Sequence, residues 1–230
     1  MEEKIKKKVI AQKLRRNGYS ISEIAEKLNI QKSGSISKWC QDICLTQGQI
    51  NRLAEKQKSG SYKGRMNFLE RLRRERIKEI SELKKKGIKD VGELKKRDFF
   101  IGGIAMYWGE GYKYSGGNQV GFTNSDPKMI LFMLKWFKDI CGVSDDRITL
   151  QVKINEAHKD RVGDVEDYWS RITKVSRDQF NKTVLIKTKS KKDYSNFNEH
   201  FGTLRITIKN GTQIRRKIMG WIDGLKNNIS

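Results

Sequence analysis

The residue that could most readily take part in a reaction is Glu110, near the end of the apolar stretch "FFIGGIAMYWGEG" at residues 99–111. This stretch is rich in small residues and places one carboxylate between Gly109 and Gly111. Two interpretations are open. In the first, the stretch is an ordinary core helix, and Glu110 satisfies backbone groups or pairs with a basic neighbour. In the second, the helix packs against a second copy of itself and delivers Glu110 to a reaction.

Two alternating segments, "RITLQVKI" (147–154) and "LRITIK" (204–209), carry a second set of candidates. Their period of two predicts strands with one apolar face. The other face collects donors and positive charge and almost no carboxylates, which suits a groove of duplex DNA. The DNA contacts predicted on this face are Thr149, Gln151, Lys153, Arg205, Thr207 and Lys209. For Lys153, an ordinary solvated lysine on a strand is the alternative.

The region 4–44 predicts three short helices. Ser20 and Glu23 have the spacing of a capping box at the start of the second helix. A helix, a tight turn and a helix behind a supporting helix form the helix-turn-helix pattern. The segment "GYSISEIAEKLNIQKSGSISKWCQDI" resembles resolvase-like and transposase-like members of that family. A three-helix scaffold for protein contacts is the alternative. The predicted groove contacts are Ser33, Ser35, Ser37, Lys38 and Gln41.

The charge balance points to a polyanionic partner. The 230 residues include 49 Lys and Arg against 27 Asp and Glu, a formal net charge of +22, which favours nucleic acid. A ribosomal or membrane-surface protein is the alternative. The excess is strongest before residue 98, where 51–97 predict a long basic helical connector with a break near Gly87. This connector is either a solvated charged helix or an additional contact to phosphates.

Further features set expectations for the cellular context. No apolar run is long enough to span a bilayer, and the start shows no signal-peptide pattern. Three cysteines are too few and too irregular for a disulfide framework. We therefore expect a cytoplasmic protein with reduced thiols and no membrane partner.

The C-terminal part changes in composition and predicts an α+β domain. Asp126 and Pro127 predict a helix start, and a turn at 115–118 predicts a hairpin. Lys113 and Gln119, on either side of this turn, join the candidate DNA contacts. The expected organisation is an all-α helix-turn-helix domain over 1–46, a basic helical linker over 47–97 and an α+β domain over 98–230. Besides the two alternating segments, we expect a helix over 99–108, a helix in "VEDYWSRIT", a strand near 183–187 and a last helix over "TQIRRKIMGWIDGL".

The order of these elements resembles a LAGLIDADG-type homing-endonuclease domain over residues 98–226. The family motif falls on "GIAMYWGEG", where Glu110 takes the place of the final acidic residue and Gly111 that of the final glycine. The resemblance implies an αββαββα domain with an antiparallel sheet that binds double-stranded DNA. It also implies that the motif helices of two copies pack together. The predicted dimer seam is Gly102, Ala105 and Gly109, which share one helical face.

The resemblance further implies a reaction. Glu110 from each of two copies would bind a divalent metal, Mg²⁺, which polarises the scissile phosphate and activates water, and Lys153 would stabilise charge on the phosphate. Because only one motif is evident, the two acids require a homodimer. A non-catalytic transcriptional regulator that uses the same surface is the alternative. Some regulators carry a LAGLIDADG-like domain followed by a helix-turn-helix, the reverse of the order here, and they bind DNA without cutting it. The combination of an N-terminal helix-turn-helix with a LAGLIDADG-like domain also resembles a bacterial group of proteins of unassigned function. An RNA-binding or structural protein is a third, weaker possibility.

Overall fold

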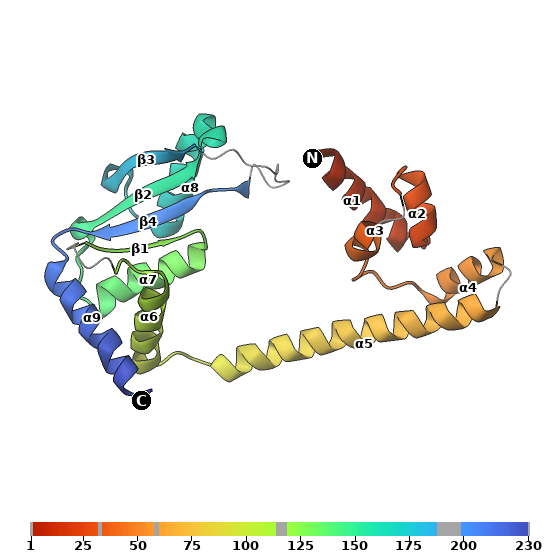
Figure 1. Ribbon diagram of the computed structural model, residues 1–230, viewed down its shortest axis with the longest axis horizontal. Coiled ribbons are helices and arrows are strands. Elements are labelled where there is room, and N and C mark those ends of the chain that lie inside the picture. The colour runs from red at the N-terminus through yellow and green to blue at the C-terminus, as the bar shows by residue number, and fades with distance from the viewer. Residues whose placement is uncertain (1, 32–33, 58–59, 114–118, 188–198, 230) are drawn as a thin grey trace. The chain divides into compact units, whose positions relative to one another are not determined.

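The structure, a computed structural model, describes residues 2–31, 34–57, 60–113, 119–187 and 199–229 (Figure 1). The described chain divides into two compact units, one made of the residues up to Gly92 and one made of those from Glu93 onward. Helices in both units and a four-stranded sheet in the second confirm the predicted α+β class. No helix among the described residues is long and apolar enough to cross a membrane.

The first unit begins with the three predicted short helices, α1 (Glu2–Arg16), α2 (Ile21–Lys27) and α3 (Gly34–Trp39). The predicted capping box is confirmed, because the Glu23 amide donates to Ser20 Oγ at 3.1 Å and the Ser20 amide donates to Glu23 Oε2 at 2.8 Å. These bonds satisfy amides that have no partner in the first turn of a helix. The three helices bury one small core of Ala11, Ile24, Ala25, Ile36 and Cys40.

Two further helices follow, α4 (Gln47–Lys56) and α5 (Gly60–Val91). Tyr62 and Met66 of α5 pack on a second small core around Leu45, Ile50 and Leu53. The predicted break near Gly87 is wrong, because α5 runs through it without interruption. A single helical glycine costs only about 1 kcal/mol relative to alanine, which a helix of this length tolerates.

A buried ion pair joins α1 to α5. Arg15 Nη2 lies 3.0 Å from Glu70 Oε1, and both side chains are only 2% exposed. The other carboxylate oxygen of Glu70 accepts a hydrogen bond from the Leu45 amide at 3.1 Å. One side of the N-terminal half of α5 therefore packs against the interior of the first unit, whereas the residues of α5 from Lys78 to Val91 are exposed.

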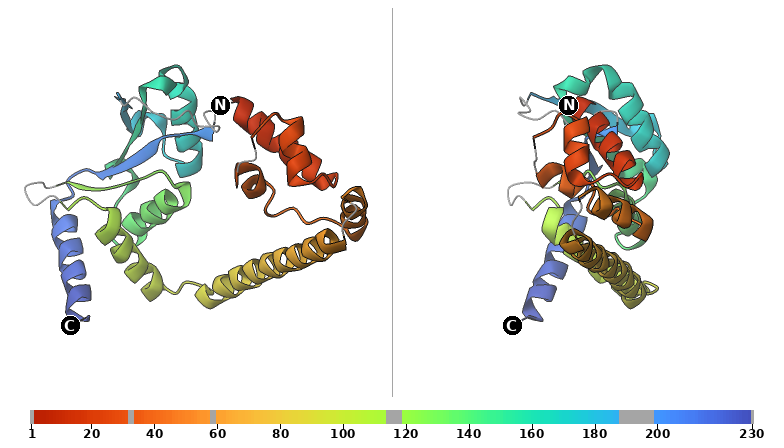
Figure 2. Two further views of the ribbon diagram at one scale, coloured as in Figure 1. Left: turned by 45° about the vertical axis from the view of Figure 1, so that its right-hand side comes forward. Right: turned by 90° about the vertical axis from the view of Figure 1, so that its right-hand side faces the viewer.

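The described residues of the second unit form four helices and four strands, which alternate except that β4 follows β3 directly. They are α6 (Lys96–Glu110), β1 (Val120–Asn124), α7 (Pro127–Asp139), β2 (Ile148–Asn155), α8 (Val162–Thr173), β3 (Phe180–Ile186), β4 (Thr203–Ile208) and α9 (Thr212–Asn227). Short 3₁₀ segments lie at 145–147, 156–161 and 177–179. In the two orientations of Figures 1 and 2, α6 and α7 lie on the same side of the sheet.

The strand order is β1-β4-β2-β3. Strand β4 pairs antiparallel with both β1 and β2, but β2 and β3 are parallel. The predicted fully antiparallel sheet is therefore wrong. The reason is α8, which carries the chain back to the same end of the sheet, and parallel neighbours require such a crossover connection. The predicted hairpin is present only in part: its second strand is β1, but a single bridge from Gly111 to Phe122 replaces the first strand. The predicted turn at 115–118 lies outside the described residues.

The core of this unit lies on one face of the sheet. The alternation predicted for β2 and β4 is confirmed, because their Ile, Leu and Val side chains are buried. The predicted start of α7 is also confirmed, since Asp126 Oδ1 accepts from the Lys128 amide at 2.7 Å and Pro127 is the first helical residue. Where α6 meets α7, a Cβ on Gly103 would overlap the indole of Trp136. Glycine is required there because the two helices approach closely.

Candidate nucleic-acid interface

The second face of the sheet is polar and carries a continuous row of side chains. Thr123 of β1 pairs in register with Arg205 of β4, Arg205 with Gln151 of β2, and Gln151 with Asn181 of β3. Residues that pair in register point to the same face of a sheet. This row therefore crosses all four strands, and Arg205 lies on one of the two interior strands.

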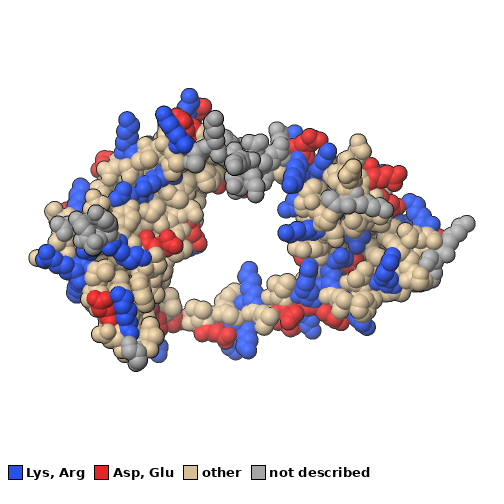
Figure 3. Space-filling view, viewed as in Figure 1, with Lys and Arg blue, Asp and Glu red and all other residues tan. Residues whose placement is uncertain are grey.

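Neighbouring rows complete what we call the polar sheet face. Its residues are Gly121, Thr123, Thr149, Gln151, Lys153, Asn181, Thr203, Arg205 and Thr207, together with Val184, which pairs with Lys153 and adds an exposed apolar side chain. The residues of the four strands include no aspartate or glutamate. In Figure 3, lysine and arginine side chains lie around the strands of this unit with some acidic side chains between them, and both signs also alternate along α5. The strands themselves carry positive charge with neutral donors and acceptors and no acid.

Several side chains that are predicted to contact DNA in this region already form hydrogen bonds within the protein. The Thr149 hydroxyl donates to the Thr207 carbonyl at 3.3 Å, and Gln151 Nε2 donates to the Lys182 carbonyl at 3.0 Å. Lys209 follows the end of β4, is exposed, and its amine lies 3.4 Å from the Asp146 carbonyl. Lys209 therefore lies at the rim of the polar sheet face, and Gln151 lies near its centre.

Arg205 has an unusual environment for a cation. Its Cζ lies 4.6 Å from the ring centroid of Tyr112, and its Nη2 donates to Gln119 Oε1 at 3.1 Å. Its Nε is buried and has no hydrogen-bond partner. None of the ion pairs among the described residues includes Arg205. The guanidinium is therefore partly withdrawn from water without an acid to balance its charge.

Tyr112 is a residue of this surface that the sequence interpretation missed. Its amide donates to the Gly121 carbonyl at 3.0 Å, and its hydroxyl lies 3.0 Å from Thr123 Oγ1. A Cβ on Gly121 would come within 2.7 Å of the Tyr112 ring, so glycine leaves the space that the ring occupies. A glycine inside a strand often marks such a close approach, and this was the available signal.

The end of α6 is tied to the same surface. The Tyr107 hydroxyl donates to the Tyr112 carbonyl at 2.9 Å. Burial raises the pKa of Tyr107 to about 12, so this donor keeps its proton at neutral pH. Lys113 does not join the polar sheet face: its amine binds the carbonyls of Trp108 and Gly109, the latter at 2.9 Å. Lys113 therefore caps the carbonyl end of α6.

Glu110, the last residue of α6, is exposed and has no hydrogen-bond or ion-pair partner among the described residues. The sheet does not bring Lys153 to it. Gly111 pairs with β1, so β1 and β4 separate it from β2 by three strand spacings, about 14 Å. The described part of the chain holds no group of three or more metal-ligating side chains. Within one chain, Mg²⁺ at Glu110 would therefore need its other oxygen ligands from water or from a substrate phosphate.

The predicted dimer seam is open over most of its length. Ala105 and Gly109 are exposed, and a Cβ on Gly109 would meet nothing within 4 Å. Gly102 is half-buried, and a Cβ there would lie 3.3 Å from Phe132 Cζ. The tightly packed glycine of α6 is instead Gly103, on the face that meets α7.

The predicted groove contacts of the first unit lie on one exposed face. Ser35, Ser37 and Lys38 are exposed on α3, whereas Ile36 is buried on its opposite face. Gln41, just beyond α3, is exposed too, and its carbonyl accepts a hydrogen bond from α5. Ser33 lies outside the described residues.

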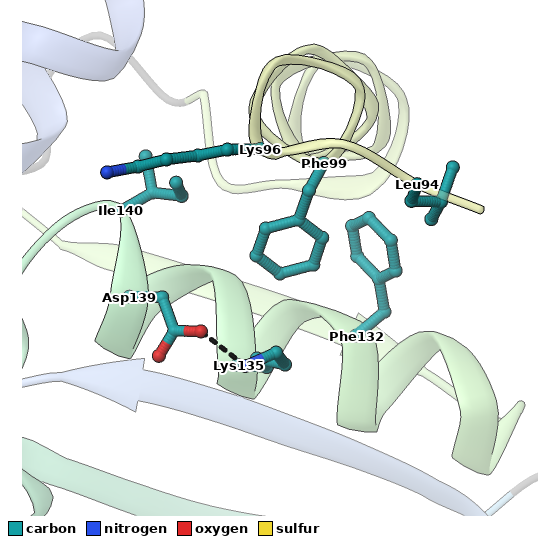
Figure 4. A pocket seen from close by; sticks show the side chains of 7 residues that line it. All are labelled: Leu94, Lys96, Phe99, Phe132, Lys135, Asp139 and Ile140. Atoms are coloured by element: carbon teal, nitrogen blue, oxygen red, sulfur yellow. Dashed lines mark hydrogen bonds and ion pairs between the residues drawn. The ribbon is translucent and has the colours of Figure 1, made fainter.

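An apolar groove on the opposite side of the second unit has different chemistry (Figure 4). It has a volume of about 610 Å³ and lies where Phe99 of α6 meets Phe132 of α7, with ring centroids 4.7 Å apart. The remaining lining residues are Leu94, Lys96, Lys135, Asp139 and Ile140. Lys135 is paired with Asp139. The groove therefore offers little to a phosphate.

Comparison of the chain with protein-family models, with curated proteins and with solved structures finds no match. The geometry of the polar sheet face and of α3 is therefore the basis for a functional assignment.

Proposed function

We propose that this protein binds double-stranded DNA and recognises sequence through the polar sheet face. The observation that carries the proposal is the partly desolvated Arg205, outside any ion pair of the described residues, at the centre of a sheet whose strands carry no acidic residue. Phosphates of the duplex supply negative charge to this basic surface as a whole. Base edges in the major groove present acceptors and donors that match guanidinium, amide and hydroxyl groups.

One feature favours a duplex over single-stranded RNA. Proteins that bind single-stranded RNA commonly stack its bases on exposed aromatic rings of a sheet. On the polar sheet face, the aromatic ring nearest the strands is that of Tyr112, and Arg205 already lies over it at 4.6 Å. The surface is thus equipped for hydrogen bonds and charge rather than for stacking.

The first unit adds a second DNA contact in this proposal. The exposed face of α3 carries Ser35, Ser37 and Lys38, small and polar residues that fit the recognition helix of a helix-turn-helix. The buried ion pair between Arg15 and Glu70 holds this helical group on α5. The formal net charge of +22 supports association with a polyanion by the whole chain.

Binding to a 30-base-pair duplex at several salt concentrations, measured by fluorescence anisotropy, tests the proposal. The logarithm of the affinity should fall linearly with the logarithm of salt, by about 0.9 per phosphate contacted. Lys209→Gln, at the rim of the polar sheet face, should make this slope shallower by about 0.9, the contribution of one phosphate contact. Lys135→Gln is the matched control, because its amine pairs with Asp139 on α7. A flat salt response, or equal slopes for both variants, would contradict the proposal.

DNA cleavage is a second candidate function, favoured by the exposed Glu110 beside an uncovered face of small residues. Because each chain supplies one such carboxylate, we infer that cutting requires two copies on one duplex. The test incubates a bound duplex with Mg²⁺ for the wild-type chain and for Glu110→Gln. Loss of cutting with retained binding supports the assignment, and cutting by Glu110→Gln overturns it. Tight binding without cutting by the wild-type chain identifies a non-catalytic regulator.

A further inference from the structure

No ion pair among the described residues balances the positive charge of Arg205. Burying a charge costs free energy unless it is paired and fully hydrogen-bonded. Arg15 also has a buried Nε without a partner, but its charge is paired with Glu70 at 3.0 Å. Arg205 has one neutral acceptor, Gln119, and a buried Nε without a partner. An arrangement of this kind indicates that a ligand completes the site.

The contacts around Arg205 also restrain its orientation. The Tyr112 ring lies against one side of the guanidinium at 4.6 Å, and Gln119 holds Nη2 at 3.1 Å. With Nε buried, the donors left for a ligand are those of the two Nη atoms that Gln119 does not use. One hydrogen of Nη1 and one of Nη2 lie on the end edge of the planar fork, and these two donors can bind a pair of acceptor atoms at once. Guanine O6 and N7 form such a pair, and so do two oxygens of a phosphate.

Position in the sheet favours the base over the phosphate. Arg205 lies on the interior strand β4, between Thr123 and Gln151 in the central row. Lys209 lies beyond the end of β4, at the rim. When a surface enters a groove, its centre faces the base edges and its rim faces the backbone. Resting on the proposed DNA binding, we therefore propose that Arg205 reads a guanine in the major groove and that Tyr112 is its positioning residue.

The role of Tyr112 follows from three contacts. Its hydroxyl is anchored to Thr123, its amide is bonded to Gly121, and its ring fills the space that this glycine leaves. The ring is therefore fixed against β1 before DNA binds. A fixed ring limits the rotamers of Arg205, which lowers the entropy lost when the guanidinium engages a base.

The experiment uses the full-length chain and a pool of random 40-base-pair duplexes. Rounds of selection yield an enriched duplex, and each of its base pairs is then substituted singly. Arg205→Ala should lose discrimination at one G·C pair, about tenfold or more, with an unchanged salt slope. Arg205→Lys keeps the charge but not the fork, and should lose the same preference. Lys209→Ala should instead weaken all duplexes similarly and lower the slope by about 0.9.

Two variants isolate the positioning role of Tyr112. Tyr112→Phe keeps the ring and should keep most of the preference, whereas Tyr112→Leu should reduce it at the same G·C pair as Arg205→Ala. A purely structural role would instead lower the thermal midpoint and weaken all duplexes equally, which would overturn the assignment of Tyr112.

The outcomes separate this inference from the proposed function. If Arg205→Ala and Arg205→Lys leave base preference intact, or if Arg205→Ala weakens all duplexes equally with a lower salt slope, Arg205 does not read a base. The inference then fails and DNA binding stands. If no duplex is enriched and binding does not depend on salt, both fail.

Discussion

Replacing Glu70 by glutamine tests how the helical group of the first unit is held on α5. The Glu70 carboxylate accepts from Arg15 Nη2 at 3.0 Å, from the Leu45 amide at 3.1 Å and from Arg73. Burial lowers the pKa of the Arg15 guanidinium, and the charge of Glu70 opposes this shift. Glu70→Gln is nearly isosteric, but it leaves a buried cation without its partner charge and turns one acceptor atom into a donor.

The expected loss is large. Breaking a buried ion pair by neutralising one partner costs about 3–5 kcal/mol, a substantial part of the roughly 5–15 kcal/mol that stabilises a folded domain. Glu75→Gln is the matched control on the same helix, because its side chain is 63% exposed and its ion pair with Arg71 spans 3.8 Å. The control should change the free energy of unfolding by less than about 1 kcal/mol.

Urea unfolding followed by far-ultraviolet circular dichroism measures both variants. Glu70→Gln should shift the midpoint far more than Glu75→Gln does. Replacing both members of the pair, as Arg15→Met with Glu70→Leu, should recover much of the loss, since apolar residues avoid the desolvation cost. A loss below about 1 kcal/mol for Glu70→Gln would refute the view that this pair holds α1 on α5.

Four further predictions follow from packing and titration. Gly103→Ala, whose Cβ would overlap a buried indole of α7, should destabilise the protein by about 1–3 kcal/mol in urea. Gly109→Ala, which faces open space, should stabilise α6 by up to about 1 kcal/mol. For Glu23, burial raises the pKa, but hydrogen bonds from Lys56 and Ser20 outweigh it and lower the pKa below its usual 4.5. The stability from these bonds is therefore present above pH 4.5 and is lost as pH falls through the lowered pKa, so Glu23→Gln should flatten the acid side of the stability–pH curve. Burial raises the pKa of Cys141 to about 12, so mass spectrometry should find it unlabelled by iodoacetamide at pH 8 until urea unfolds the protein.

Local features of the chain were predictable because each depends on neighbouring residues. The alternation in β2 and the cap pairs at Ser20 and Asp126 follow from periodicity and from backbone groups left open at helix ends. The direction of β3 was not predictable in this way. A strand's pattern is the same whichever way the chain runs, so only the crossover through α8 made it parallel to β2.

The candidate site also has features that follow from neighbouring residues and features that follow only from distant ones. The absence of acids from the strands and the period that gathers Arg205, Gln151 and Thr207 on one face can be read directly from the printed chain. The environment of Arg205 cannot, because Tyr112 and Gln119 meet it across 93 and 86 residues through the pairing of β1 with β4. Residue types and local periodicity determine which groups face outward. Long-range pairing determines which of them are held, desolvated and left without a counter-charge, because those properties depend on neighbours that are distant in the chain.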